Sequence, residues 1–99
     1  MTDTPPQSEV DISSSSILLV DDNVQNLELM QAFLEELPCT IQTASDGIEA
    51  IEKIERNIPN LLILDVMMPR MSGFEVCQKV KSQPSTRDIV VIMVTALNE

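Results

Sequence analysis

Three short apolar runs in this chain each end in a carboxylate or a hydroxyl. Residues 17–20 run into Asp21 and Asp22, residues 61–64 run into Asp65, and residues 89–94 run into Thr95. If these runs are neighbouring parallel strands, about 4.8 Å apart, three carboxylates and a hydroxyl meet at one edge of a sheet. Carboxylates at that distance repel one another, so the arrangement needs a metal ion or a proton.

Between these runs, apolar residues recur at helical spacing. The three stripes are Leu27, Met30, Leu34 and Leu37 before Pro38; Ile48, Ile51 and Ile54; and Val76, Cys77 and Val80. Residues 40–44 form a further, weaker strand pattern. Strands that alternate with helices of this length predict an α/β domain with a parallel sheet and helices on its faces. The all-apolar runs 61–64 and 89–94 indicate strands covered on both faces.

The predicted helix starts agree with this division. Three pairs have the form of a capping box or a close relative, namely Asp22 with Gln25, Asp46 with Glu49, and Ser72 with Glu75. A cap explains one acid of the pair Asp21 and Asp22, but not two, so both a structural and a functional interpretation stay open. In a parallel α/β sheet the ligand site lies at the carboxyl ends of the strands, where these acids fall.

The net charge of −10 argues against unaided binding to nucleic acid or to an anionic membrane. It fits cation binding or docking on a basic protein surface. No apolar stretch approaches the roughly 20 residues that span a bilayer, and no signal-type segment follows Met1. We therefore expect a cytoplasmic protein with reduced thiols at Cys39 and Cys77, which, without any histidine, do not form a metal site.

The chain is long enough for one small domain. Residues 1–16 are polar, with Pro5, Pro6 and a serine run, and predict a flexible leader. The single domain then occupies residues 17–99.

The most specific motif follows the second of the three apolar runs and reads Asp65-x-x-Met68-Pro69-x-Met71-Ser72-Gly73. Taken alone, it is a loop with a turn at Gly73 and core-filling methionines, just as Thr95 alone is a β-branched strand end. Three further motifs occur in order around it: Leu18-Leu19-Val20-Asp21-Asp22, Asp46-Gly47 before Glu49-Ala50, and Val94-Thr95-Ala96. With these motifs, residues 17–99 resemble the receiver domain of two-component response regulators.

This resemblance implies a doubly wound, flavodoxin-like parallel sheet of strand order 2-1-3-4. It implies that Asp65 accepts a phosphoryl group from a sensor histidine kinase or a phosphotransfer protein, and that the protein is not an enzyme. Mg²⁺ would be bound by Asp21, Asp22, Asp65 and the backbone carbonyl of Met67, and this hard cation suits such oxygen ligands. The Thr95 hydroxyl would hydrogen-bond a phosphoryl oxygen, and Ala96 would leave room for the group.

A receiver of this family continues after Thr95 with a helix, a fifth strand that carries a lysine, and a last helix. These parts are missing here, and Lys53, Lys79 and Lys81 fall on predicted helices and do not replace that lysine. We therefore expect an incomplete receiver domain over residues 17–99. Residues 89–94 then form an unguarded apolar edge strand, which allows self-association. The alternative function is that of an inactive receiver that serves only as a protein-interaction module.

Overall fold

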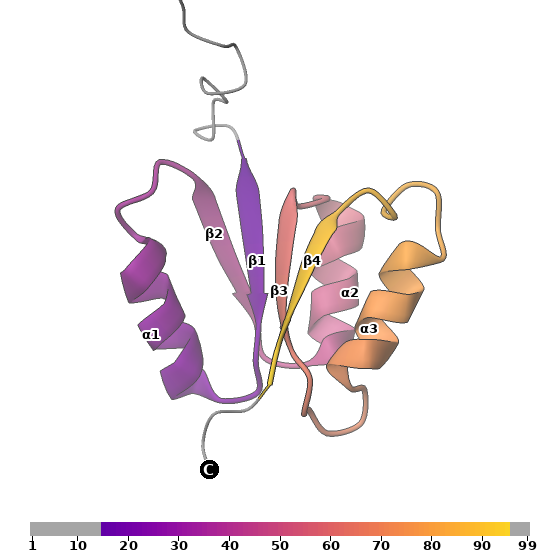
Figure 1. Cartoon of the computed structure of the whole chain (residues 1–99), viewed down its shortest axis with the longest axis horizontal. Coiled ribbons are helices and arrows are strands. Elements are labelled where there is room, and N and C mark those ends of the chain that lie inside the picture. The colour runs from indigo at the N-terminus through magenta and orange to yellow at the C-terminus, as the bar shows by residue number, and fades with distance from the viewer. Residues whose placement is uncertain (1–14, 96–99) are drawn as a thin grey trace, which may run out of the picture.

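The computed structural model describes residues 15–95, which form a parallel sheet with helices on both faces (Figure 1). In chain order the elements are β1 (Ser16–Val20), α1 (Val24–Leu34), β2 (Thr40–Ala44), α2 (Gly47–Arg56), β3 (Leu61–Asp65), α3 (Gly73–Lys81) and β4 (Val90–Val94). The strand order is β2-β1-β3-β4 and every pair is parallel. The predicted doubly wound, flavodoxin-like sheet is confirmed. Of the predicted leader, all but Ser15 and Ser16 lies outside the described residues, and Ser16 already belongs to β1.

The strand pairing brings the carboxyl ends of the strands together. Val20 of β1 lies opposite Ala44 of β2 and opposite Leu64 of β3. Asp65 of β3 lies opposite Val94 of β4. Because the strands are parallel and in this register, the residues that follow β1, β3 and β4 emerge at one edge of the sheet.

The side chains of the sheet alternate between two cores. Leu18, Val20, Leu62 and Leu64 pack with α2 and α3, whose buried residues include Ile54 and Val76. The opposite face is smaller, since Ile17 and Leu19 pack there against Leu27 of α1. Figure 1 shows this division, with α1 on one side of the sheet and α2 and α3 on the other.

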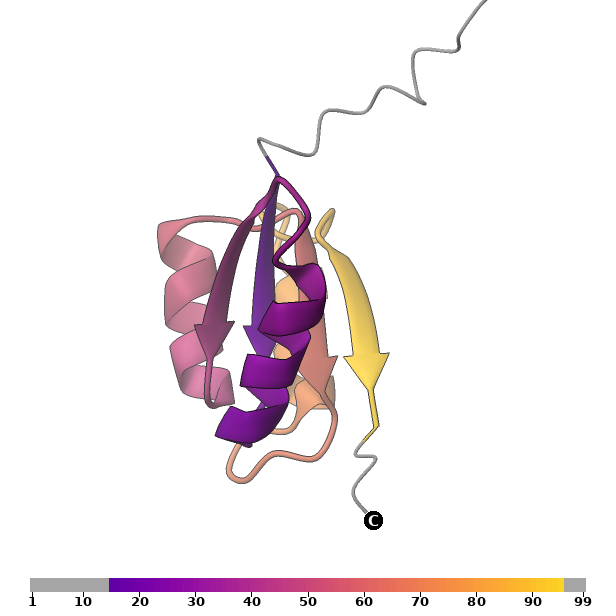
Figure 2. The same cartoon turned by 90° about the vertical axis from the view of Figure 1, so that its left-hand side faces the viewer.

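One face of β4 is open in the described part of the chain. Val90 is 59% exposed and Ile92 is 46% exposed, although they lie beside Leu61 and Ile63 on the face that α1 covers elsewhere. Figure 2 shows why, because α1 stands in front of the sheet with β4 off to one side. The prediction of two covered faces therefore fails for β4 within residues 15–95. Within those residues β4 has a paired strand on one side only, as expected for an edge.

The start of α1 differs from the prediction. Asn23, and not Asp22, is the N-cap, and its side chain accepts hydrogen bonds from the backbone N–H groups of Gln25 and Asn26. Asp22 is thereby left out of the helix cap, exposed at the sheet edge. The predicted caps Asp46 and Ser72 are confirmed, and Ser72 forms a full capping box with Glu75.

The end of α1 also differs. The helix stops at Leu34, and the Leu37 N–H donates to the Leu34 carbonyl in the turn that follows. A residue before proline avoids the helical conformation, so Pro38 excludes Leu37 from a continuation of the helix. Leu37 consequently lies outside the helix and is partly exposed. No helix within residues 15–95 combines the length and apolar character needed to cross a membrane.

Candidate functional site

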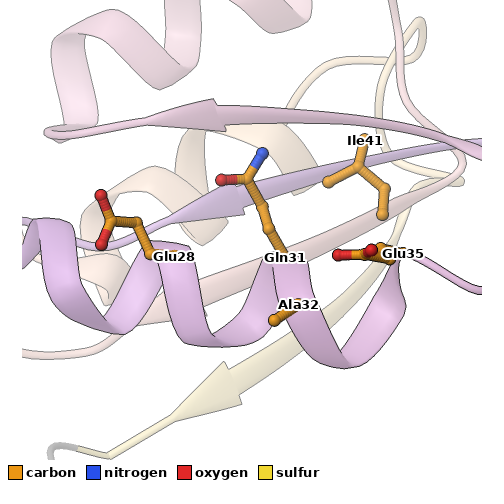
Figure 3. A pocket seen from close by; sticks show the side chains of 5 residues that line it. All are labelled: Glu28, Gln31, Ala32, Glu35 and Ile41. Carbon is orange, nitrogen blue, oxygen red and sulfur yellow. The ribbon is translucent and has the colours of Figure 1, made fainter.

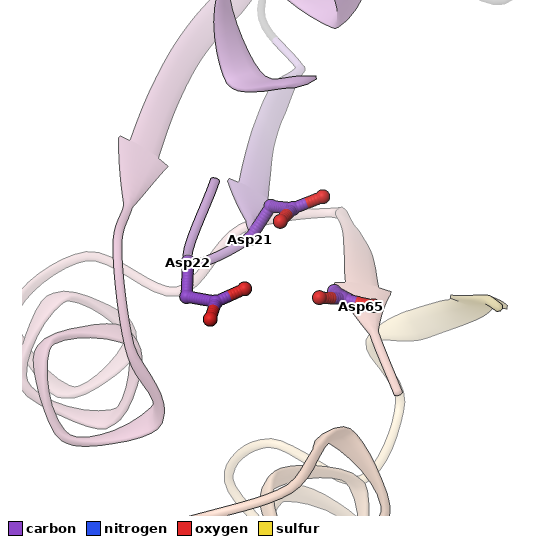
Figure 4. A group of neighbouring side chains, drawn as sticks. All are labelled: Asp21, Asp22 and Asp65. Carbon is purple, nitrogen blue, oxygen red and sulfur yellow. The ribbon is translucent and has the colours of Figure 1, made fainter. Parts of the chain in front are cut away.

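Three aspartates converge at the carboxyl edge of the sheet. Asp21 and Asp22 follow β1, and Asp65 is the last residue of the neighbouring strand β3. Each offers one carboxylate oxygen, and these three oxygens lie within 4.8 Å of one another. Figure 4 shows Asp22 and Asp65 facing each other with Asp21 beside them. The structure therefore brings together all three acids that the sequence analysis singled out.

Backbone and side-chain donors hold two of the three carboxylates. Asp21 is only 7% exposed, and its Oδ1 accepts from the N–H of Asn23 at 2.9 Å while its Oδ2 accepts from Nδ2 of Asn26 at 3.2 Å. Asp65 is also 7% exposed, and its Oδ1 accepts from the N–H of Met67 at 3.2 Å. Asp22 faces solvent. The cluster thus has two fixed, buried acids and one accessible acid.

The charges of the cluster act on Asp65. Burial raises the pKa of the Asp65 carboxyl above its ordinary value, and the nearby charges of Asp21 and Asp22 raise the pKa further. The hydrogen bond from the Met67 N–H opposes this shift of the Asp65 pKa without cancelling it. The carboxylates of Asp21 and Asp22 therefore repel an ionised Asp65, and a cation placed among the three acids would reduce this repulsion.

The donor set fits a hard divalent cation. Mg²⁺ binds oxygen ligands at about 2.1 Å in an octahedron, so two of its ligand atoms are at most about 4.2 Å apart. Carboxylate oxygens within 4.8 Å of one another need only a small movement, or an intervening water, to share such an ion. The exposure of Asp22 leaves one side of the cluster open for an ion that keeps part of its hydration shell.

Two further predicted site residues lie at the same edge. Thr95 directly follows β4 and is exposed, one residue beyond the position paired with Asp65. Met67 is 68% exposed, and its backbone N–H is the donor to Asp65. Ala96 lies outside the described residues.

Gly73 has a role that the sequence analysis did not assign. A Cβ atom on Gly73 would lie 2.3 Å from the carbonyl oxygen of Asp65. The Gly73 N–H also donates to the Val66 carbonyl at 3.0 Å. Its φ is not in the left-handed region, so the predicted turn is not the reason for the glycine. The missing side chain allows the start of α3 to pack directly against the end of β3, which fixes the backbone of Asp65.

The left-handed residue of this loop is Arg70, with φ of 69°. Its guanidinium lies 3.5 Å from Oδ2 of Asp46, the N-cap of α2, and is largely exposed.

As predicted, the lysines lie on helices. Lys53 donates to the Thr43 carbonyl and pairs with Glu49. Lys81 donates to the carbonyls of Arg87 and Ile89.

An open groove lies away from the cluster, between α1 and β2 (Figure 3). Glu28, Gln31, Ala32 and Glu35 of α1 and Ile41 of β2 line it. Among the described residues that line it, Glu28 and Glu35 are the ionisable ones, and no predicted site residue within 15–95 belongs to it.

Comparisons with known proteins agree with the geometry. The model of the response regulator receiver domain family matches residues 17–99. The chain is 45% identical over 85 residues to response regulator PleD of Caulobacter vibrioides, covering 86% of this chain and 19% of PleD. It is 40% identical over 86 residues to the alkaline phosphatase synthesis transcriptional regulatory protein PhoP of Bacillus subtilis, covering 87% of this chain and 35% of PhoP.

Solved structures give the same result. The N-terminal domain of a response regulator receiver protein from Methanoculleus marisnigri JR1 superposes with a TM-score of 0.79 at 38% identity, covering 83% of this chain and 67% of that one. The chemotaxis protein CheY4 of Vibrio cholerae gives a TM-score of 0.79 at 29% identity, with 87% and 72% covered. The chain spans about a fifth of PleD and about a third of PhoP.

Proposed function

Because this chain belongs to the response regulator receiver domain family, we propose that it accepts a phosphoryl group on Asp65 from a histidine kinase or a phosphotransfer protein. The convergence of the Asp21, Asp22 and Asp65 carboxylates carries the proposal. A buried acid whose neighbours are two more acids serves no purpose in packing, whereas phosphotransfer to a carboxylate needs this arrangement.

The hydrogen bond to Asp65 defines the reacting atom. Oδ1 accepts from the Met67 N–H, which orients the carboxylate and leaves Oδ2 as the nucleophile. Oδ2 attacks phosphorus, the P–N bond of the donor phosphohistidine breaks, and the imidazole nitrogen leaves with the electron pair. The product is an acyl phosphate on Asp65, and the Thr95 hydroxyl donates to one of its phosphoryl oxygens.

Asp21, Asp22, Asp65 and the backbone carbonyl of Met67 would hold Mg²⁺. When bound, the ion supplies positive charge that offsets the repulsion between the Asp65 carboxylate and the incoming phosphoryl group.

The proposed partners are proteins and not nucleic acid or membrane, in keeping with the net charge of −10. Cys39 and Cys77 are free thiols, which fits the reducing cytoplasm that we propose as its location.

The test is labelling by a small phosphodonor such as acetyl phosphate, followed by mass spectrometry. We expect one Mg²⁺-dependent phosphoryl group on Asp65, absent from Asp65→Asn and strongly reduced in Asp22→Ala. Glu52→Gln, which removes an exposed acid of α2, is the matched control and keeps the label. No label on the 99-residue chain, together with none on a version extended by a receiver fifth strand and last helix, would overturn the proposal.

A second candidate is a receiver that no longer transfers phosphate and acts only as an interaction module. The observation in its favour is the engagement of Lys53 and Lys81 with backbone carbonyls, which leaves neither ready to pair with a phosphoryl group. This candidate predicts partner binding that is indifferent to Mg²⁺ and to Asp65→Asn. Loss of binding in that variant would exclude it.

The exposed apolar side chains of β4 support a proposal of self-association at this edge. Sedimentation of the 99-residue chain should show a dimer that dissociates in Ile92→Lys. Its matched control, Val24→Lys, changes an exposed apolar residue of α1 and should leave the dimer intact. A wild-type monomer at all accessible concentrations would contradict the proposal.

A further inference from the structure

The carboxylate of Asp21 is held at both oxygens by the beginning of α1. Oδ1 accepts from the backbone N–H of Asn23 at 2.9 Å, and Oδ2 accepts from Nδ2 of Asn26 at 3.2 Å. A carboxylate can only accept hydrogen bonds, so the amide NH₂ of Asn26, and not its oxygen, faces Asp21. The Asn26 side chain is therefore a neutral donor that contacts the acid cluster from the helix.

Asn26 is itself fixed by the helix cap. The Oδ1 atom of Asn23 accepts from the N–H of Asn26 at 3.2 Å, which holds residue 26 in the first turn of α1. The next residue, Leu27, is buried against the sheet and anchors this turn. The position of the Asn26 amide relative to Asp21 is thus set by a cap on one side and a core contact on the other.

This donor counteracts a specific force. Asp21 has one oxygen within 4.8 Å of oxygens of both Asp22 and Asp65, and like charges at that distance favour rotation of the Asp21 carboxylate away from its neighbours. A hydrogen bond at Oδ2 opposes this rotation without adding charge of its own. Each oxygen keeps a second lone pair, which remains available to a cation or to its hydration water.

We propose that Asn26 is a positioning residue of the acid cluster, which holds Asp21 in the orientation that receives a hydrated divalent cation. The inference rests on the proposed function, because it concerns the metal that the same three aspartates would hold. Partners that orient metal ligands through hydrogen bonds typically change metal affinity by about 10- to 100-fold when they are lost. Since Asp22 and Asp65 remain in place, we expect a loss of about tenfold here, at the lower end of that range.

The alternative is that Asn26 only stabilises the first turn of α1. Asn26→Leu separates the two roles, because leucine has the same branching and a good helix propensity but no donor. Asn26→Gln keeps an amide donor on a longer side chain. Gln25→Ala, at the exposed neighbouring position of the same turn, is the matched control.

The experiment measures Mg²⁺ affinity directly by calorimetric titration of the folded protein, with urea unfolding in a chelator as the stability readout. We expect Asn26→Leu to raise the dissociation constant about tenfold with little change in the urea midpoint without metal. Asn26→Gln should recover part of the affinity, and Gln25→Ala should match the wild type. In acetyl phosphate labelling, Asn26→Leu should raise the half-saturating Mg²⁺ concentration and leave the rate at saturating Mg²⁺ nearly unchanged.

Several outcomes would overturn the inference. One is a wild-type Mg²⁺ affinity in Asn26→Leu, and another is a drop in the urea midpoint with no change in affinity, which would assign Asn26 to the helix alone. If Asn26→Leu does not fold, a wild-type affinity in Asn26→Ala, which also lacks a side-chain donor, decides against the inference. Asp22→Ala and Asp65→Asn distinguish it from the proposed function: if they also keep wild-type affinity, the proposed metal site itself is wrong.

Discussion

Replacement of Asp65 by asparagine should stabilise the protein when no divalent cation is present. The carboxylate of Asp65 is buried beside Asp21 and Asp22, and its raised pKa shows that the folded state disfavours its ionised form. A raised pKa means that the folded state binds the proton more tightly than the unfolded state, so this residue lowers stability as the pH rises from 3.8, its ordinary value, through the raised value. The destabilisation is complete above the raised pKa, and Asp65→Asn removes it while keeping an acceptor for the Met67 N–H.

The distances between the three carboxylates set the size of the expected stabilisation. Two unit charges 4.8 Å apart interact with about 3.5 kcal/mol at an effective dielectric constant of about 20, and with about 0.9 kcal/mol in bulk water. The repulsion energy between Asp65 and the buried Asp21 is nearer the first value, and the repulsion energy between Asp65 and the exposed Asp22 is nearer the second. After reorganisation of water and counterions, we expect a net gain of about 2 kcal/mol in the free energy of unfolding. For a domain of this size that is roughly 10 °C in melting temperature.

Thermal melts of wild type and variant in EDTA at low ionic strength measure this gain. Glu52→Gln is the control, because it changes the net charge equally at an exposed site of α2. Saturating Mg²⁺ should reverse the order, since a ligand at 100 times its dissociation constant stabilises the wild type by about 2.7 kcal/mol and Asp65→Asn gains less. Asp22→Ala should also lose most of the Mg²⁺ gain. If Asp65→Asn and Glu52→Gln melt at the same temperature in EDTA, the carboxylates do not repel one another and the reasoning is refuted.

Two other predictions concern the surroundings of the site. Gly73→Ala should cost about 3 kcal/mol in urea unfolding, because its Cβ would meet the Asp65 carbonyl oxygen at 2.3 Å and backbone cannot yield. Gly47→Ala should cost less, since the three atoms nearest its Cβ, at 2.8–2.9 Å, belong to the Met71 side chain and not to backbone; an equal cost would contradict this account. The pKa of Glu49 is lowered, chiefly by the hydrogen bond from the Ser45 N–H, so its ionised form contributes stability above pH 4.5 that is lost as the pH falls through the lowered pKa. Melting curves against pH should therefore show Glu49→Gln less stable than wild type at pH 7 and the difference vanishing in acid.

The sequence predicts the sheet well, because three of its four strands are local apolar patterns followed by a local polar signal, and only β2 has a weaker pattern. Convergence of Asp21, Asp22 and Asp65 follows from topology alone, since parallel strands end at the same edge. The uncovered face of β4 was not predicted from its pattern. An all-apolar strand indicates two covered faces, but residues 15–95 cover only the face of β4 that carries Val91 and Met93 and leave Val90 and Ile92 exposed on the other.

The finer parts of the site depend on contacts that have no distinctive sequence signal. Asp22 and Asn23 are equally good helix caps by residue type, so the sequence alone does not decide which of them begins α1. The sequence shows only that residue 73 is a glycine, and a glycine is expected both at a turn and where two backbones approach closely. An asparagine in the first turn of a helix is common, so nothing in the sequence connects Asn26 with Asp21.

Asp65 and Asp46 have different surroundings, and the difference supports the ligand proposed for the cluster. Asp46 caps α2 and has the guanidinium of Arg70 at 3.5 Å, so a backbone donor and a cation both lie beside its carboxylate. Asp65 accepts one backbone hydrogen bond, and its charged neighbours Asp21 and Asp22 are both acids. An asparagine at position 65 would accept that hydrogen bond without the repulsion, so the fold does not need a carboxylate there. The proposed function would account for a negative charge at Asp65, because a carboxylate can both bind a divalent cation and attack an electrophilic phosphorus.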